Sequence, residues 1–399
     1  MPKNSYLITR GINRPFLGLD KSLLLGNLDM ELTERCNNNC VHCYINLSAS
    51  DICASKKELT CEEIKKILKE AESLGCRRIR FTGGEPFLRK DFEELYIFAR
   101  KLGLSVLIFT NATLITPQLA NLFARIPPLE KIEITVYGMR KSSYEGVTRT
   151  AGSFKLFQNG VKLLLEKKIP FLVKAALLPQ NKEEINVIEK WARAIPGMNR
   201  PPLFSIFFNL RCRRERSKNM LIKKLRLSGE EGFKILLRNK KEYIKEMKDF
   251  ASKFMYPPGD MIFSCGSGRG GGCVDAYGRF QPCLMLRSPE CSYNLKTGSL
   301  KDALENFFPK LRAKKALNPE YLKQCANCFL KSFCEQCPAR SWEEHGTLDT
   351  PVEYCCEVAH VLARSLGLIK SGEKGWEIRD YRERIKEFVN RDFNRRQDG

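Results

Sequence analysis

The chain has 399 residues, of which 43% are hydrophobic and 29% are charged, and its formal net charge is +22. This composition is typical of a globular protein and excludes a disordered or fibrous chain. The length allows one large domain and a smaller one. The sequence contains no apolar run that is long enough for a signal peptide or a membrane-spanning helix, so we expect a cytoplasmic protein that does not bind membranes.

The excess of positive charge has two interpretations. It could mark an anionic partner such as nucleic acid or an acidic peptide. The basic residues are spread along the chain, however, and surfaces rich in lysine and glutamate also occur in heat-stable proteins. This distribution favours the second interpretation, and we do not expect a nucleic-acid-binding protein.

Strand-like and helix-like segments alternate from residue 27 to residue 210. Strands are predicted at 27–32, 77–83, 105–111, 131–137, 170–177 and 203–210. Helices are predicted near 60–74, 91–103, 116–125, 153–168 and 181–195, the first of them beginning with a capping box formed by Thr60 and Glu63. Six consecutive β/α units predict an α/β fold, a partial (β/α)6 TIM-like barrel whose functional residues gather at the carboxyl ends of its parallel strands.

The composition changes after the alternating segments and predicts further parts of the chain. Residues 1–26 form an N-terminal extension before the barrel of residues 27–210. Residues 211–264 are basic and helical, and form either a solvated linker or a contact surface for an acidic substrate. Residues 265–360 are rich in cysteine and glycine and are predicted to form a small second domain, followed by a charged helical tail at 361–399.

The stretch "CNNNCVHCY" places Cys36, Cys40 and Cys43 directly after the first predicted strand. In a reducing compartment, clustered thiols are metal ligands more often than crosslinks. Three thiolates are too few for a closed zinc site, and His42 is adjacent to Cys43, so the two side chains are poorly placed to reach one metal together. We therefore interpret the loop as the ligand set of a [4Fe–4S] cluster with one iron open to a substrate or cofactor.

The spacing of these cysteines, with Tyr44 beside them, resembles the signature of radical S-adenosylmethionine (AdoMet) enzymes. The resemblance implies that the methionine moiety of AdoMet chelates the open iron, and that electron transfer from the cluster yields a 5′-deoxyadenosyl radical that abstracts hydrogen from a substrate. It also implies AdoMet contacts from the strand-following segments of the barrel. These contacts are expected from Tyr44, from Gly83, Gly84 and Glu85 of "TGGEP", from Asn111, from Thr135 of "ITVYG" (otherwise an ordinary strand residue), and from Arg149 and Lys174.

The C-terminal cysteines, taken alone, are compatible with a zinc ribbon. Following a barrel of this kind, their order resembles the SPASM domain, which carries two auxiliary [4Fe–4S] clusters. The resemblance assigns one cluster to Cys325, Cys328, Cys334 and Cys355. Because Cys356 directly follows Cys355, one of these two adjacent cysteines is not needed as a ligand. The resemblance assigns the other cluster to Cys265, Cys283 and Cys337, with Cys273 or, less well, Cys291 as a fourth ligand, or with an iron left open. Gly278 would form the turn between two strands of this region.

The resemblance covers roughly residues 27–360 and implies a radical AdoMet oxidoreductase. We expect a ribosomally made peptide or protein as its substrate, with a tetrapyrrole precursor of the haem type as the alternative. A zinc-binding nucleic-acid module is the alternative from another class, but it does not explain why Cys36, Cys40 and Cys43 precede "GGEP". The expected partners are the substrate, an electron donor such as a flavodoxin or ferredoxin, and a separate leader-binding protein, since only 26 residues precede the first strand.

Overall fold

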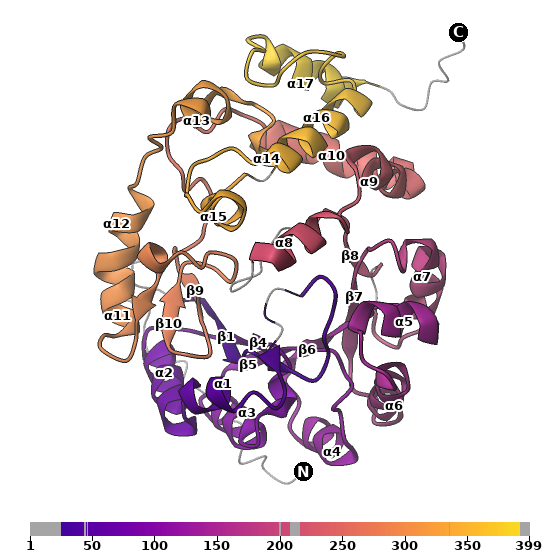
Figure 1. Ribbon diagram of the computed structural model, residues 1–399, viewed down its shortest axis with the longest axis vertical. Coiled ribbons are helices and arrows are strands. Elements are labelled where there is room, and N and C mark those ends of the chain that lie inside the picture. The colour runs from indigo at the N-terminus through magenta and orange to yellow at the C-terminus, as the bar shows by residue number, and fades with distance from the viewer. Residues whose placement is uncertain are drawn as a thin grey trace. The chain divides into compact units, whose positions relative to one another are not determined.

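The computed structural model describes residues 25–43, 45, 47–198, 201–207, 216–334 and 336–391 (Figure 1). The chain divides into two compact units. Unit 1 consists of Met1–Arg226 and Gly266–Leu311, and unit 2 consists of Leu227–Cys265 and Arg312–Gly399. Among the described residues, no helix has the length and hydrophobicity that crossing a bilayer requires.

Within the described part of unit 1, nine strands form one sheet in the order β11-β10-β9-β1-β4-β5-β6-β7-β8. The six strands from β1 to β8 in this order are parallel to one another, which confirms the predicted α/β fold. Their bounds are β1 (Asn27–Thr33), β4 (Arg78–Gly83), β5 (Ser105–Thr110), β6 (Leu129–Thr135), β7 (Phe171–Ala176) and β8 (Leu203–Ser205). Two short strands, β2 (Arg35–Cys36) and β3 (Leu47–Ser48), pair separately.

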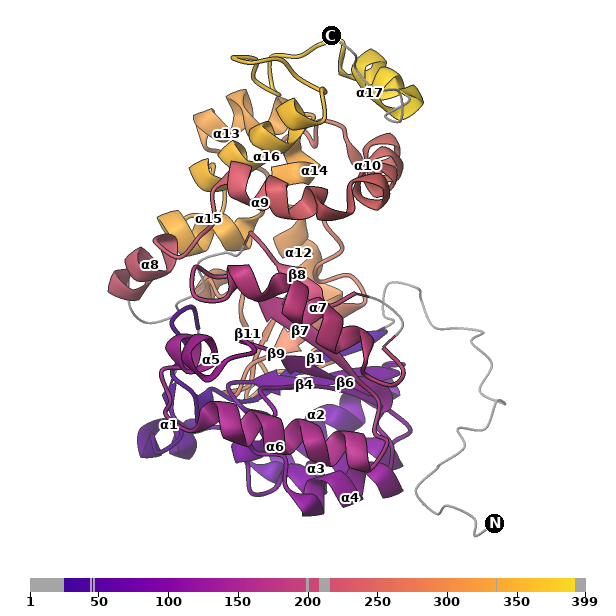
Figure 2. The same ribbon diagram turned by 90° about the vertical axis from the view of Figure 1, so that its right-hand side faces the viewer.

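Helices pack against one face of this sheet, as Figure 2 shows for α2, α3, α4 and α6. The cause is an amphipathic pattern, because α2 buries the apolar side chains at 64, 67, 68 and 71. The predicted capping box of Thr60 and Glu63 begins this helix. The helices of unit 1 are α1 (Ile52–Lys57), α2 (Cys61–Ser73), α3 (Phe92–Lys101), α4 (Pro117–Arg125), α5 (Lys141–Thr148), α6 (Ser153–Glu166), α7 (Ile185–Arg193), α8 (Arg216–Lys223), α11 (Leu300–Asp302) and α12 (Phe308–Arg312), the last ending at the unit boundary.

The segment after residue 265 extends the barrel sheet. Strand β9 (Gly271–Val274) pairs in parallel with β1, and β10 (Arg279–Gln281) pairs with β9 and β11 (Tyr293–Asn294) in antiparallel fashion. Gly278 has a φ of 84° in the β9–β10 connection, a left-handed conformation that suits glycine. Because β9 joins β1, the division of the chain differs from the predicted boundaries: residues 266–311 belong with the barrel rather than with the rest of 265–360.

Unit 2 is helical. Its elements are α9 (Gly229–Leu236), α10 (Lys240–Phe254), α13 (Pro319–Lys323), α14 (Lys331–Cys334), α15 (Pro338–His345), α16 (Glu353–Ser365) and α17 (Tyr381–Asn390). Its core contains the fully buried side chains of Phe329, Leu330 and Phe388. Residues 211–215 of the predicted basic linker lie outside the described residues, as do residues 208–210 of the predicted strand 203–210 and Tyr44.

Candidate functional site

The cysteine loop lies at the carboxyl end of β1 and is held by the C-terminus of α5. The backbone N–H of Asn39 donates to Thr148 O at 2.9 Å, and that of Val41 donates to Val147 O at 2.9 Å. The last carbonyls of a helix have no partner within the helix, so these bonds satisfy both segments. The loop is therefore fixed to the barrel by backbone contacts on either side of Cys40.

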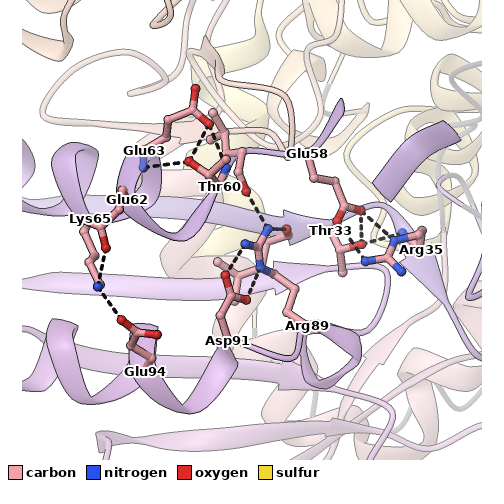
Figure 3. Close-up of polar contacts among 12 residues, drawn as sticks. Thr33, Arg35, Glu58, Thr60, Glu62, Glu63, Lys65, Arg89, Asp91 and Glu94 are labelled. Atoms are coloured by element: carbon pink, nitrogen blue, oxygen red, sulfur yellow. Dashed lines mark hydrogen bonds and ion pairs between the residues drawn. The ribbon is translucent and has the colours of Figure 1, made fainter. Parts of the chain in front are cut away.

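A buried ion pair fixes the residue before Cys36 (Figure 3). Arg35 Nη2 lies 3.0 Å from Glu58 Oε2, and its Nε donates to Glu58 Oε1 at 3.0 Å. Thr33 Oγ1 donates to the same carboxylate. The side chains of Arg35 and Glu58 are only 14% and 5% exposed, so this bidentate pair is largely shielded from water. It determines the direction in which the chain enters the cysteine loop.

The "TGGEP" segment is attached to the end of β1. The N–H of Gly84 donates to Thr33 O at 2.8 Å, and the N–H of Glu85 donates to Arg35 O at 2.9 Å. A Cβ atom would lie 2.2 Å from Thr33 O at Gly83 and 2.1 Å from Arg35 O at Gly84. Both glycines are therefore required by the close approach of two strands, a reason that the sequence alone did not indicate.

Glu85 is fully buried and joins the ends of β4 and β5. Its carboxylate accepts hydrogen bonds from Thr110 Oγ1 at 2.8 Å, from the N–H of Asn111 at 2.9 Å and from the N–H of Phe87 at 3.4 Å. Burial raises the pKa of Glu85 to about 7, although these hydrogen bonds lower it. The sequence predicted an AdoMet contact for this residue, and its contacts in the structure show that it also braces the barrel rim.

Two side chains from the barrel contact the thiols. Asn111 Nδ2 lies 3.8 Å from Cys36 Sγ, and the Tyr137 hydroxyl hydrogen-bonds the Cys40 thiol. The sequence placed Asn111 on this rim as an AdoMet contact, and the structure brings its amide to the cysteine loop. No role for Tyr137 was predicted from the sequence, although this residue belongs to the "ITVYG" motif. Because a hydrogen bond to sulfur tunes a metal–thiolate centre, both residues belong to the surroundings of the candidate cluster.

The electrostatics of the loop suit a metal centre. Burial and the neighbouring Cys43 raise the pKa of Cys36 to about 12, and the same causes raise that of Cys40 well above its usual value. Cys40 is buried and Cys36 and Cys43 are half-buried, and three thiols so close together in one loop are costly to ionise unless a cation binds them. This donor set fits a [4Fe–4S] cluster held by three thiolates.

A row of charged side chains occupies the sheet face opposite the helices. Lys174 Nζ lies 3.5 Å from Glu133 Oε2 and 2.9 Å from the ring centroid of Phe109. On the same ring, the guanidinium of Arg80 lies 4.6 Å from the centroid and pairs with Asp29 at 2.9 Å. Lys174, a predicted AdoMet contact, is thus engaged by protein groups in this row. The row lines the inner wall of the barrel with paired cations and anions.

The two remaining predicted AdoMet contacts lie at the ends of their elements. Thr135 is the last residue of β6 and is half-buried, opposite Lys174 of β7. Arg149 ends α5 in a left-handed conformation with a φ of 51° and has an exposed side chain. A non-glycine residue in this region is uncommon. Arg149 directly follows Val147 and Thr148, whose backbone carbonyls hold the cysteine loop.

Unit 2 contains a cavity, here called the thiol cavity, that is lined by Cys325, Cys328, Cys334 and Cys356 together with Lys331 and His360. The sequence favoured Cys355 as the fourth ligand, but Cys355 does not line this cavity. Its Sγ accepts a hydrogen bond from Arg340 Nη1 at 3.2 Å instead. The reason is helical geometry: successive residues of α16 point about 100° apart, so only one of the two neighbours faces the cavity.

The thiol cavity fits a metal centre with four thiolate ligands. Burial and the neighbouring Cys334 raise the pKa of Cys325 to about 12, and burial raises that of Cys334 to about 11. Cys356 is among the neighbours that raise the pKa of both thiols. Such a donor set suits a [4Fe–4S] cluster and also a tetrahedral zinc ion.

The other predicted ligands fall in different units. Cys265 and Cys337 belong to unit 2, whereas Cys283 and Cys273 belong to unit 1, so a second auxiliary cluster stays a prediction. Cys273 is buried on β9, with its Sγ 3.9 Å from Arg287 Nη2. That arginine pairs with the buried Glu31 at 2.7 Å. Cys291, the weaker substitute, is also buried.

Comparison with known proteins finds relatives of the barrel. Residues 30–192 match the Radical SAM superfamily. The chain is 27% identical over 348 residues to the AdoMet-dependent heme synthase of Methanosarcina barkeri, a match that covers 82% of this chain and 94% of that protein. Streptococcus suis SuiB bound to S-adenosylmethionine has a similar fold, with a TM-score of 0.59, 16% identity, and coverage of 84% of this chain and 75% of SuiB. The anSMEcpe structure with bound AdoMet and Cp18Cys peptide also has a similar fold. Its TM-score is 0.54 at 14% identity, and the match covers 91% of this chain and 99% of anSMEcpe.

Proposed function

We propose that this chain is a radical SAM enzyme that uses AdoMet and a [4Fe–4S] cluster held by Cys36, Cys40 and Cys43. The match of residues 30–192 to the Radical SAM superfamily supports the proposal. The observation that carries the proposal is the convergence of three thiols, one buried and two half-buried, in one loop that α5 holds in place. When bound, the cluster and AdoMet supply a 5′-deoxyadenosyl radical, which abstracts a hydrogen atom from the substrate.

The residues around the loop have distinct proposed roles. Asn111 and Tyr137 donate hydrogen bonds to the thiolates and thereby stabilise their negative charge. The backbone carbonyls of Gly83 and Gly84 accept hydrogen bonds from the ammonium group of AdoMet, and Glu85 keeps this segment in place through its contacts with β5. Tyr44, Thr135, Arg149 and Lys174 remain proposed AdoMet contacts.

For the substrate, we propose first a tetrapyrrole of the haem type. The support is a relative, named as a haem synthase, that matches this chain over 94% of its own length. The inner wall supports a carboxylate-bearing substrate, because Arg80 and Lys174 are only partly buried and could exchange their present anionic partners for substrate carboxylates. The second candidate is a peptide or protein, supported by the shared fold of SuiB and the peptide-bound anSMEcpe.

The experiment begins with anaerobic purification and measurement of iron and sulfide. Iron-bound protein that yields 5′-deoxyadenosine on addition of dithionite and AdoMet supports the proposed activity. Cys36→Ala should abolish this product, whereas the matched control Cys53→Ala, at an exposed cysteine, should not. Colourless protein with zinc and no iron would overturn the proposal.

The substrate is tested by adding Fe-coproporphyrin III to the active enzyme, a tetrapyrrole that appears in the name of another relative, the Fe-coproporphyrin III synthase of Methanosarcina barkeri, 33% identical over 159 residues. A mass change in this compound, with 5′-deoxyadenosine formed above the basal rate, supports a tetrapyrrole substrate. If Fe-coproporphyrin III is unchanged while a peptide encoded beside the gene is modified under the same conditions, the tetrapyrrole proposal fails and the peptide is the substrate.

A further inference from the structure

The wall of the thiol cavity contains a buried cation, Lys331. This residue is 4% exposed, and its Nζ lies 2.9 Å from the Tyr321 hydroxyl and 4.9 Å from the centroid of the same ring. Among the described residues, no carboxylate lies within ion-pair distance of this ammonium group. A buried charge is costly unless an opposite charge compensates it. Four thiolates bound to iron would supply that negative charge within the same cavity.

A second group in the cavity wall is directed at one of the thiols. The N–H of Gly375 donates to His360 Nε2 at 3.0 Å, which makes Nε2 an acceptor and leaves the proton on Nδ1. Nδ1 lies 2.7 Å from the backbone oxygen of Cys356 and 3.5 Å from its Sγ. His360 thus presents an N–H to the carbonyl and the sulfur of the same cysteine, and a backbone contact on its other side keeps the ring in that orientation.

We propose that Lys331 and His360 raise the reduction potential of a [4Fe–4S] cluster held by Cys325, Cys328, Cys334 and Cys356. Reduction adds one electron and therefore one negative charge to the cluster. A buried cation and an N–H···S hydrogen bond both stabilise the more negative, reduced form. The role rests on the proposed function: hydrogen abstraction would leave a substrate radical, and a cluster with a raised potential would accept one electron from it, so that the substrate is oxidised as the cluster is reduced.

The electrostatic part of the proposal is tested with Lys331→Met in the holoenzyme, with Lys331→Arg as the charge-preserving variant. Lys323→Met is the matched control, because Lys323 is exposed and belongs to the same unit.

The measurement is an EPR-monitored redox titration. The cluster proposed for the cysteine loop is first removed with Cys36→Ala, Cys40→Ala and Cys43→Ala, and the remaining clusters are then titrated with dithionite while their EPR signals are recorded. We expect Lys331→Met to lower the reduced-to-oxidised ratio at a fixed ambient potential at least tenfold, equivalent to about 59 mV for a one-electron couple. The Lys331→Arg and Lys323→Met variants should keep a reduced-to-oxidised ratio close to that of the unsubstituted protein.

The hydrogen bond is tested with a second pair of variants, which also serves if Lys331→Met fails to fold. Asn can place an N–H near the position of the histidine Nδ1, and Leu cannot, so His360→Leu should lower the potential and His360→Asn should restore most of it. An iron-loaded Lys331→Met or His360→Leu protein with an unchanged potential would overturn the role of that residue. Zinc in place of iron would overturn the proposal as a whole. AdoMet cleavage is measured separately on protein that retains Cys36, Cys40 and Cys43, so failure of the proposed function is distinguishable from failure of this inference.

Discussion

Asn111 Nδ2 lies 3.8 Å from Cys36 Sγ, although 75 residues separate the two along the chain. The same amide donates to Asn37 Oδ1 at 3.0 Å, and its oxygen accepts a hydrogen bond from the N–H of Thr113 at 2.9 Å. The end of β5 is thereby connected to the cysteine loop. The contact gives Asn111 a role in the surroundings of the thiols, beyond the AdoMet contact that the sequence predicted.

Asn111→Leu should lower the reduction potential of the cluster proposed for Cys36, Cys40 and Cys43, because it removes an N–H···S hydrogen bond. The rate of 5′-deoxyadenosine formation should fall roughly 10- to 100-fold, the usual effect of losing such an outer contact. An EPR-monitored redox titration and a product assay measure the two effects. Gln118→Leu is the control, since Gln118 is an exposed amide that donates to Glu93 at 3.1 Å. An unchanged potential in Asn111→Leu would contradict the prediction.

Cys356→Ala should remove about four irons per chain, the content of one cubane cluster, whereas Cys355→Ala should retain them. The two residues are adjacent in α16, but only Cys356 lines the thiol cavity. Iron and sulfide analysis of the anaerobically purified variants measures the difference. The opposite result would show that Cys355 is the ligand.

Glu58→Gln should destabilise the protein by about 3 kcal/mol, because it leaves the buried guanidinium of Arg35 without its counter-charge. Glu62→Gln is the matched control, since Glu62 pairs with Lys65 at an exposed position and its loss should cost less than about 1 kcal/mol. Figure 3 shows both pairs. Urea unfolding under anaerobic conditions measures the two free energies, and equal losses would disprove the special role of the Arg35–Glu58 pair.

Glu85 should make the cluster-free protein less stable as pH rises. Burial raises its pKa to about 7 from a usual value of 4.5, so the folded state binds more protons than the unfolded state between these values. Stability is therefore highest below pH 4.5 with respect to this group, and it falls by up to about 3 kcal/mol as pH rises to 7. The measured quantity is the difference in unfolding free energy between the unsubstituted protein and Glu85→Gln across this window. A difference that does not vary with pH would refute the shift.

The barrel and its cysteine loop could be predicted because their signals are local. Alternating hydrophobic segments predicted the six parallel strands, and the capping box of Thr60 and Glu63 begins α2 where expected. The spacing of Cys36, Cys40 and Cys43 indicated a metal ligand set within a stretch of eight residues.

The remaining features depend on geometry that spacing does not contain. The choice between Cys355 and Cys356 depends on the rotational phase of α16, which the order of cysteines leaves open. Tyr137 lies in a recognised motif, but only the folded barrel shows that its hydroxyl reaches Cys40. The pairing of β9 with β1 joins segments some 240 residues apart, a distance at which hydrophobic patterns carry no pairing information.

That pairing also constrains the order of events during synthesis. When residues 27–210 have left the ribosome, the outer edge of β1 still lacks the strand that covers it in the finished protein, because β9 begins only at Gly271. An uncovered strand edge is a template for pairing with other chains. The nascent enzyme must therefore keep that edge from self-association while the first helices of unit 2 are still being translated.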